Sequence, residues 1–137
     1  MHHSITVQTR AQTEFLDITQ HIQTVVSEKR IQNGLCQIFV PHTTAGITIN
    51  ENADPSVRHD MIMELNKVIP FDDNYHHMEG NSAAHIKSSL MGVSLSVIVD
   101  QGRLILGTWQ GIYFCEFDGP RQRKVWIKLL EEKDTSK

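Results

Sequence analysis

The chain has 137 residues, of which 39% are hydrophobic and 21% are charged, and this balance excludes a disordered or fibrous protein. Its formal net charge of −3 gives no overall positive field, so we expect no nucleic-acid partner. No apolar run approaches the roughly 18 residues that a membrane span needs, so we expect no membrane partner either. The length and composition are those of one globular domain spanning 1–137.

Two cysteines and eight histidines are the reactive side chains of most interest. Cys36 and Cys115 lie in separate apolar segments and lack the spacing of a metal-binding pair. We interpret them as reduced core residues of a cytoplasmic protein. His2 and His3 at the start are assigned no function, so the informative histidines lie further along the chain.

The first third of the chain predicts four strands and one helix. Alternating apolar and polar residues indicate a half-buried strand at 4–9, and a second strand is predicted at 15–19. Apolar residues then recur at helical spacing at Ile18, Ile22, Val25 and Val26, and Asn33-Gly34 is expected to end that helix. Buried strands are predicted next, at 35–40 and 47–50.

A second helix is predicted to start at Asp54-Pro55, since aspartate caps a helix and proline suits its first turn. Its apolar stripe consists of Val57, Met61, Leu65 and Val68. Pro70 stops it, and 71–80 then forms a loop of about ten residues, a length that is often functional in a compact domain.

The third helix is predicted at 83–91, with Asn81 or Ser82 as its cap and Gly92 at its end. The rest is mostly strand, with a hairpin turn at Asp100-Gln101-Gly102 and a polar tail at 131–137. The strands are predicted at 93–99, 103–106, 111–117 and 124–130. These strands and three helices predict an α+β domain, in which a mixed or antiparallel sheet packs on helices.

Polar side chains follow the predicted strand at 35–40. His42, Thr43 and Thr44 leave the strand end, where a core strand would hold them rigidly, as a functional site requires. Alternatively, the threonines make turn hydrogen bonds and His42 faces water. The segment by itself leaves both interpretations open.

Three histidines and a carboxylate lie within 75–85: His76, His77, Glu79 and His85. Neutral imidazole is the commonest metal ligand, but adjacent histidines rarely bind one metal together. On the third helix, His85 shares a face with Ser89, and Lys87 on the opposite face is expected in solvent. Because the spacing matches no zinc signature, a metal site and a solvated cluster both remain open.

A third segment places Trp109 and Gln110 after a glycine, where a ring and an amide can face a ligand. The turn at 118–120 presents Arg121 and Arg123, which can clamp a phosphate or pair with acidic residues. Trp126 is expected to anchor the core.

In this order, the three segments resemble the YjbQ-like family, also called the secondary thiamine-phosphate synthase family. The similarity rests on HTTAGITINENADPSVRHD, NYHH…EGNSAAHIKSSLMG and GTWQGIYFCEFDGPR, and it runs from about 35 to 121. The resemblance implies a small α+β fold assembled as a homotrimer, with clefts near subunit boundaries. It also implies weak thiamine phosphate synthase activity, which joins a hydroxymethylpyrimidine diphosphate to a thiazole phosphate and releases pyrophosphate.

By motif position, the resemblance implies a metal ion, usually taken as zinc, bound by His42, His77 and His85, with His76 replacing His77 if the loop shifts by one. Its catalytic positions fall on Glu51 and Asp54, as acid/base or histidine-orienting residues, and on Arg121, which would bind phosphate. Its ligand-binding positions fall on Lys87, Ser89, Trp109, Gln110, Glu116 and Asp118. Lys87 would act from a neighbouring subunit.

Two alternatives stand beside this enzyme of phosphorylated small molecules. One is a non-catalytic trimeric module that binds a metal or a metabolite, which a closed shell of four metal ligands would favour. The other is a metal-dependent hydrolase of a phosphorylated small molecule, built from the same residues. An open metal position that faces a cleft would favour an enzyme.

Overall fold

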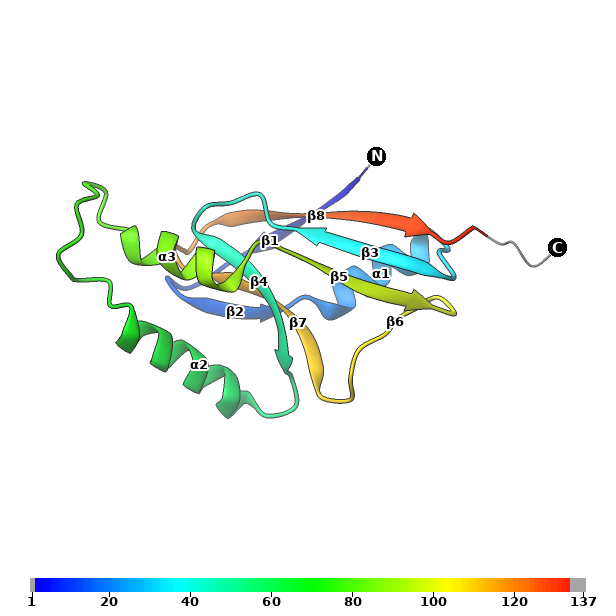
Figure 1. The fold of residues 1–137 in the computed structure, drawn as a ribbon, viewed down its shortest axis with the longest axis horizontal. Coiled ribbons are helices and arrows are strands. Elements are labelled where there is room, and N and C mark those ends of the chain that lie inside the picture. Colours follow the sequence, from blue (N-terminus) through cyan, green and yellow to red (C-terminus); the bar gives the residue numbers. More distant parts are fainter. Residues whose placement is uncertain (1, 134–137) are drawn as a thin grey trace.

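The computed structural model describes residues 2–133, which contain eight strands and three helices (Figure 1). The strands are β1 (His3–Gln8), β2 (Glu14–Asp17), β3 (Gly34–Phe39), β4 (Ala45–Glu51), β5 (Ser94–Asp100), β6 (Arg103–Leu104), β7 (Gln110–Glu116) and β8 (Gln122–Glu131). The helices are α1 (Thr19–Glu28), α2 (Pro55–Val68) and α3 (Ser82–Met91). None of the helices in this part of the chain has the length and apolar content to cross a membrane. The predicted α+β class is confirmed.

The strands form two antiparallel sheets. The larger has five strands in the order β1-β8-β3-β5-β6, and the smaller has three in the order β2-β7-β4. Strands from opposite ends of the chain pair directly, as Ile5 of β1 does with Val125 of β8. The hairpin from β5 to β6 turns at Gln101 and Gly102, which both have positive φ as a two-residue turn requires.

Most of the hydrophobic core lies between the two sheets and α1. Side chains alternate along each strand, so Ile38 of β3 is buried while its neighbours Leu35 and Phe39 on the other face are exposed. Ile127 of β8 and Ile22 of α1 are fully buried in the same core. One face of the five-stranded sheet therefore remains outside this core.

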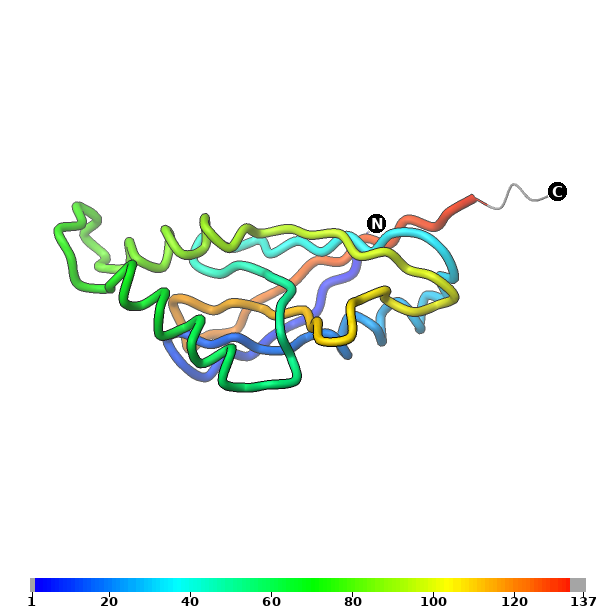
Figure 2. The backbone as a smooth tube through the Cα atoms, turned by 60° about the horizontal axis from the view of Figure 1, so that its bottom comes forward, coloured from blue at the N-terminus to red at the C-terminus, as the bar shows by residue number. Residues whose placement is uncertain are grey.

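A second, smaller core lies on the other face of the three-stranded sheet. Its central strand β7 is buried on both faces, since Phe114 faces the first core whereas Tyr113 and Cys115 face the second. Phe15 of β2, Ala84 of α3 and Phe117 complete the second core, and α2 runs along the outside of the molecule (Figure 2). This packing fixes α3 beside the three-stranded sheet.

Helix α1 ends earlier than the sequence predicts. It ends at Glu28 rather than at Asn33-Gly34, and Arg30 turns the chain with a left-handed φ of 57°. Gly34 begins β3 instead, where an added Cβ atom would collide with the carbonyl of Leu130. The glycine thus serves the close approach of β8 and not the helix end.

Helix α2 begins and ends as predicted. The carboxylate of Asp54 accepts a hydrogen bond from the Ser56 N–H at 2.9 Å, Pro55 is the first helical residue, and Pro70 follows the end. The predicted apolar stripe is only partly buried, because Val68 is 67% exposed. Helix α2 therefore covers the second core loosely.

The expectation that Lys87 faces solvent is wrong. Its side chain is fully buried beneath α2 and the segment that follows α2. Its ammonium group donates to the amide oxygen of Asn66 and lies 4.0 Å from the centre of the Phe71 ring. Burial lowers the pKa of Lys87. The helical pattern placed Lys87 opposite His85 correctly, but it contains no information about what covers that face.

The two cysteines lie where the sequence predicts, whereas Trp126 does not. Cys36 and Cys115 are buried free thiols, and burial raises the pKa of Cys36 to about 12. Trp126 lies on the outer face of the five-stranded sheet, stacked on Phe39, and is not a core anchor. Its position follows from strand alternation, because its neighbours Val125 and Ile127 are the buried ones.

The first two residues of the predicted polar tail at 131–137 make defined backbone contacts. Glu131 ends β8, and the Glu132 N–H donates to the carbonyl of Asn33 at 2.7 Å. Residues 134–137 lie outside the described residues.

Candidate functional site

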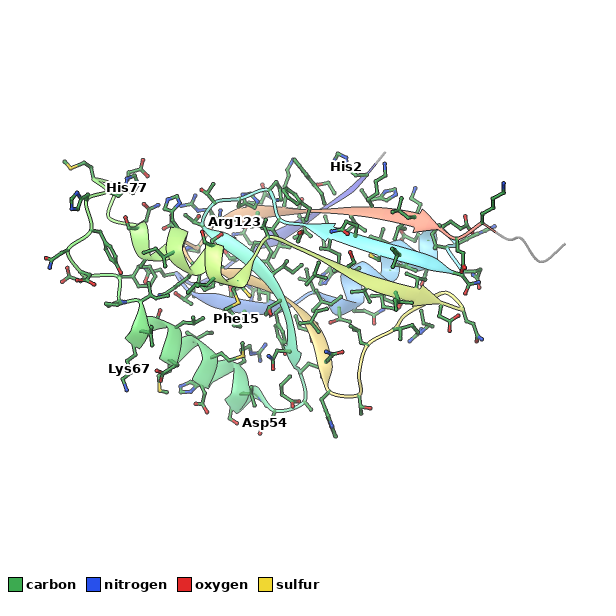
Figure 3. All side chains as sticks on the ribbon, viewed as in Figure 1. His2, Phe15, Asp54, Lys67, His77 and Arg123 are labelled. Atoms are coloured by element: carbon green, nitrogen blue, oxygen red, sulfur yellow. The ribbon has the colours of Figure 1, made fainter. Side chains whose placement is uncertain are left out.

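A cleft with a volume of about 960 Å³ opens between the β3–β4 connection, α3 and the start of β8. His42 and Thr44 line it from the β3–β4 connection, His85 and Ser89 from α3, and Arg123 from β8. Figure 3 shows Arg123 beside the β3–β4 connection. Residues that are distant in sequence thus face one space, because both sheets and α3 meet there.

A buried ion pair between Arg123 and Glu116 lies beneath this cleft, and Arg123 lines it. Arg123 is 3% exposed and Glu116 is fully buried. The Nε and Nη2 atoms of Arg123 donate to the two carboxylate oxygens of Glu116, and Nη2 also donates to Thr44 Oγ1 at 2.8 Å. Pairing at two points holds the guanidinium group in one orientation.

Hydrogen-bond donors occupy both carboxylate oxygens of Glu116. Besides the two bonds from Arg123, Thr9 Oγ1 donates to Oε1 at 2.8 Å and the Asp118 N–H donates to Oε2 at 3.0 Å. Burial acts to raise the pKa of Glu116, but these hydrogen bonds and the Arg123 charge outweigh it and hold the pKa below its usual value. Glu116, a predicted ligand-binding residue, therefore binds Arg123 and does not face the open space.

The backbone fixes the ring of His42 at the cleft. The Lys124 N–H donates to His42 Nε2 at 2.9 Å, so the neutral ring carries its proton on Nδ1 and neither nitrogen has a free lone pair. Burial and the charges of Arg123 and Arg121 lower the pKa of His42, against the opposite effect of the Glu116 carboxylate. In this arrangement His42 is a neutral residue of the cleft.

A second hollow, of about 530 Å³, lies toward the loop between α2 and α3 and shares His85 with the cleft. His76 and His77 line it from the loop. The rings of His77 and His85 have centres 5.6 Å apart and are nearly perpendicular, at 87°. The predicted histidines thus lie in two adjoining spaces, with His85 between them.

The ring centres of His77 and His85 are near enough for two ligands of one metal ion, whereas the predicted set of three does not assemble in this chain. Two imidazoles on one tetrahedral zinc ion have ring centres about 5 Å apart, close to the separation observed. His42 must first release the Lys124 N–H and turn before it can join them. Accordingly, residues 2–133 contain no group of three His, Cys, Asp or Glu side chains positioned to hold a metal.

Arg121 lies at the rim of the cleft in a weak polar cluster. Its Nη2 lies 3.4 Å from Asp118 Oδ2, and the Asn81 side-chain amide donates to the same oxygen at 2.9 Å. The Arg121 side chain is 51% exposed, so water screens this ion pair and the arginine is free to bind an anion in the cleft that it lines. The Ser89 hydroxyl, also at the cleft, donates to the His85 carbonyl at 3.0 Å.

Four predicted site residues lie at the opposite end of the three-stranded sheet: Glu51, Asp54, Trp109 and Gln110. The side-chain oxygens of Glu51 and Gln110 accept hydrogen bonds from nearby backbone N–H groups, and Trp109 is 63% exposed. Figure 3 shows Asp54 far from His77, at the other end of α2. The structure does not bring these four together with the histidines in one chain, so their role in the site remains a prediction.

Arg123 and Thr44 are cleft residues whose role the sequence left open. Both are more than nine-tenths buried. Arg123 shares the inward face of β8 with Val125 and Ile127, as residues two apart on a strand do. A charged residue in an inward position indicates a buried partner, and this signal was available in the sequence.

Comparison with known proteins shows likeness over nearly the whole chain. The family model described as UPF0047 protein YjbQ-like matches residues 3–132. The chain is 54% identical over 127 residues to a UPF0047 protein of Methanocaldococcus jannaschii, covering 93% of this chain and 92% of that protein. It is 53% identical over 128 residues to UPF0047 protein YugU of Bacillus subtilis, covering 93% and 97%. A crystal structure of an uncharacterized conserved protein of the YjbQ/UPF0047 family from Clostridium acetobutylicum matches with a TM-score of 0.91 at 53% identity, covering 93% of this chain and 98% of that chain.

Proposed function

The chain belongs to the YjbQ-like UPF0047 family, and we propose that it is an enzyme whose cleft binds a phosphorylated small molecule and acts on it with a divalent metal ion, zinc first. The first reaction proposed is that of a thiamine phosphate synthase, which joins a hydroxymethylpyrimidine diphosphate to a thiazole phosphate and releases pyrophosphate. The family resemblance alone supports thiamine as the product. The cleft supports the broader class, since both substrates carry phosphate.

The observation that carries this proposal is the convergence of arginine and histidine side chains on one cleft. Arg121 and Arg123 both line it, and a guanidinium group matches the geometry of phosphate oxygens. His85 stands between the cleft and His77, where the paired rings fit a metal ion. Donors and a cation held in one sheltered space stabilise charge that develops on phosphate oxygens.

The histidines and Arg121 have different proposed roles. His77 and His85 are the proposed metal ligands, joined by His42 once its ring turns away from the Lys124 N–H. When bound, zinc supplies a Lewis acid for a substrate oxygen. Arg121 holds a phosphate group of the substrate from the rim of the cleft.

We further propose that the enzyme is a cytoplasmic homotrimer. The outer face of the five-stranded sheet exposes apolar residues: Phe39 and Trp126 stack on each other, and Leu35, Ile98 and Leu130 line a hollow of about 540 Å³. Exposed apolar patches of this kind mark contact surfaces between proteins. Phe39 also lines the cleft, so a neighbouring subunit on this face would lie at the cleft mouth.

A matched pair of histidine variants tests the metal-dependent enzyme. His85→Ala should lose the metal and lower turnover at least about 100-fold, because a direct ligand matters more than its outer partners. His59→Ala removes an exposed imidazole from α2 and should change neither. The measurements are metal content, thiamine phosphate formation and pyrophosphate release.

Full metal content and equal turnover in His85→Ala would contradict the metal-dependent enzyme. Stoichiometric metal in a wild-type protein that turns over no phosphorylated substrate would instead favour the non-catalytic binding module.

A matched pair of variants at exposed apolar positions tests the trimer. The wild-type protein should have a solution mass three times the 15.6 kDa of the chain. Trp126→Glu places a charge on the proposed contact face and should give the single-chain mass. Met63→Glu, at an exposed position on α2, should leave the assembly intact. A wild-type protein that is monomeric at micromolar concentration would exclude the trimer.

A further inference from the structure

We propose that Arg123 and Thr44 form a fixed oxyanion site at the floor of the cleft and that this site binds a phosphoryl group of the substrate. The inference rests on the proposed function and deepens it. Arg121 was the expected phosphate ligand, whereas this inference assigns the principal contact to a second, buried arginine.

One nitrogen of Arg123 remains available to a ligand. Its Nε and Nη2 atoms donate to Glu116 and Thr44, but Nη1 donates to no group in residues 2–133. Nη1 is not sealed off from solvent either. Among the described residues, the side-chain atoms that are fully enclosed and lack a partner are Thr13 Oγ1 and Asn81 Oδ1. Because Arg123 is 3% exposed and lines the cleft, what remains accessible of its guanidinium group faces that space.

Thr44 supplies a second donor beside it. Its hydroxyl oxygen accepts from Arg123 Nη2 at 2.8 Å, so the hydroxyl proton is free to point elsewhere. That proton has no acceptor among the described residues, and Thr44 is 5% exposed and lines the cleft. Two buried donors, joined by a hydrogen bond, thus face one space without a partner.

The surrounding hydrogen bonds keep these donors in place. Glu116 holds two nitrogens of Arg123, while Thr9 and the Asp118 N–H hold Glu116 in turn. A donor that is already oriented loses little conformational freedom when an anion binds, unlike the half-exposed Arg121. An ion pair with a purely structural role needs only Nε and Nη2 of Arg123. It does not explain why Nη1 lies at the cleft without a partner.

The number and depth of the donors favour a phosphoryl group over a carboxylate. Arg123 and Thr44 line the cleft as buried residues, and Arg121 lines it with a half-exposed side chain. A phosphoryl group has three outer oxygens that can accept from separate sides, whereas a carboxylate presents two oxygens in one plane. The site therefore matches a tetrahedral anion.

Calorimetric titration of inorganic phosphate into the purified protein tests the site. Arg123→Met alone leaves a buried unpaired carboxylate and can fail to fold. The decisive variant is therefore Glu116→Gln/Arg123→Met, which removes both charges. Its amide oxygen can accept from the Asp118 N–H, and its amide NH2 can donate to the Thr9 hydroxyl, which then donates to the Arg121 carbonyl instead. Thr44→Val keeps the ion pair and removes only the hydroxyl. Arg103→Gln, at an exposed position on β6, is the control for the loss of one positive charge.

The double variant should bind phosphate about 10- to 100-fold more weakly than the wild type, as expected when a charged hydrogen bond is lost. Thr44→Val should bind it several-fold more weakly, and Arg103→Gln within twofold of the wild type. Melting curves and metal analysis must show the same fold and metal content in all variants. Acetate should bind more weakly than phosphate to the wild type.

Phosphate binding by the double variant within twofold of the wild type would overturn the site, as would a wild-type protein that binds no phosphate. Acetate binding as tight as phosphate binding would overturn the phosphoryl assignment. Failure of the proposed function looks different: phosphate would bind through Arg123, but no phosphorylated substrate would be turned over.

Discussion

The two ends of the three-stranded sheet hold their polar side chains in different ways. At the cleft end, Glu116 and Arg123 are buried, and each holds the other in place. At the opposite end, Trp109 is exposed, and Glu51 and Asp54 accept hydrogen bonds from backbone N–H groups two residues away. Only the cleft end maintains charged groups out of water in fixed positions.

This difference distinguishes residues of a candidate binding site from residues that only stabilise turns and helix ends. Burying a charge is costly unless a partner and hydrogen bonds compensate, and the cleft end provides both for Arg123. A turn needs only local hydrogen bonds, and Asp54 supplies one to start α2. The contrast therefore predicts different consequences of mutation at the two ends.

The largest effect is expected at the buried ion pair. Arg123→Met should lower the free energy of unfolding by about 3–5 kcal/mol, because it leaves the Glu116 carboxylate buried and unpaired. Glu116→Gln/Arg123→Met should recover most of that loss, since no charge then remains buried. Urea denaturation of both variants measures their free energies of unfolding. A loss below about 1 kcal/mol in the single variant would show that the buried pair matters no more than the local hydrogen bonds at the other end.

A smaller effect is expected on acidification. The pKa of Glu116 lies below its ordinary value of 4.5, so the stability that it contributes is present above pH 4.5. That stability is lost as the pH falls through the depressed pKa of the folded state. Unfolding curves recorded between neutral pH and that range should therefore show a decline that Glu116→Gln flattens. Equal pH dependence of stability in the wild type and Glu116→Gln would contradict a stabilising ion pair between Glu116 and Arg123.

At the other end, Asp54→Ala should act on α2 alone. Losing the cap bond to Ser56 should lower the melting temperature by a few degrees. Phosphate affinity should stay within twofold of the wild type, because Asp54 is not part of the cleft. A much weaker phosphate affinity in a folded Asp54→Ala protein would show that the two ends work together.

The smallest effect is expected for Trp109→Ala. The exposed ring is not needed for the core, so the melting temperature should change by less than about two degrees. Turnover of the same variant shows whether this end of the sheet also takes part in the reaction. Loss of turnover at unchanged stability would mean that this end completes the site of a neighbouring subunit, and that the contrast within one chain is incomplete.

The fold was predictable from the sequence as far as its signals are local. Alternation and helical spacing located every helix and strand, and the Asp54-Pro55 start of α2 is confirmed. The pairing of Ile5 with Val125 and the division into two sheets depend on contacts between distant segments, which alternation does not encode. Lys87 shows the same limit, since the helix that buries it lies elsewhere in the chain.

The motifs named several residues that line the cleft, such as His42 and His85, but not how those residues are arranged. Thr44 and Glu51 belong to one quoted motif, yet the seven residues of β4 separate them by about 20 Å. Gln110 and Glu116 likewise stand at the two ends of β7. When a motif runs along an extended strand, its first and last residues therefore lie at opposite ends of the sheet. His42 lines the cleft, but its lone pair is used by a backbone N–H that no motif reveals.

A crystal structure of the purified protein with inorganic pyrophosphate and its native metal tests the central claim most directly, with the metal located by anomalous scattering. The account predicts phosphate oxygens within hydrogen-bond distance of Arg123 Nη1 and a metal ion between His77 and His85. Pyrophosphate bound instead beside Trp109 and Gln110, with the cleft empty and His85 without a metal, would contradict it.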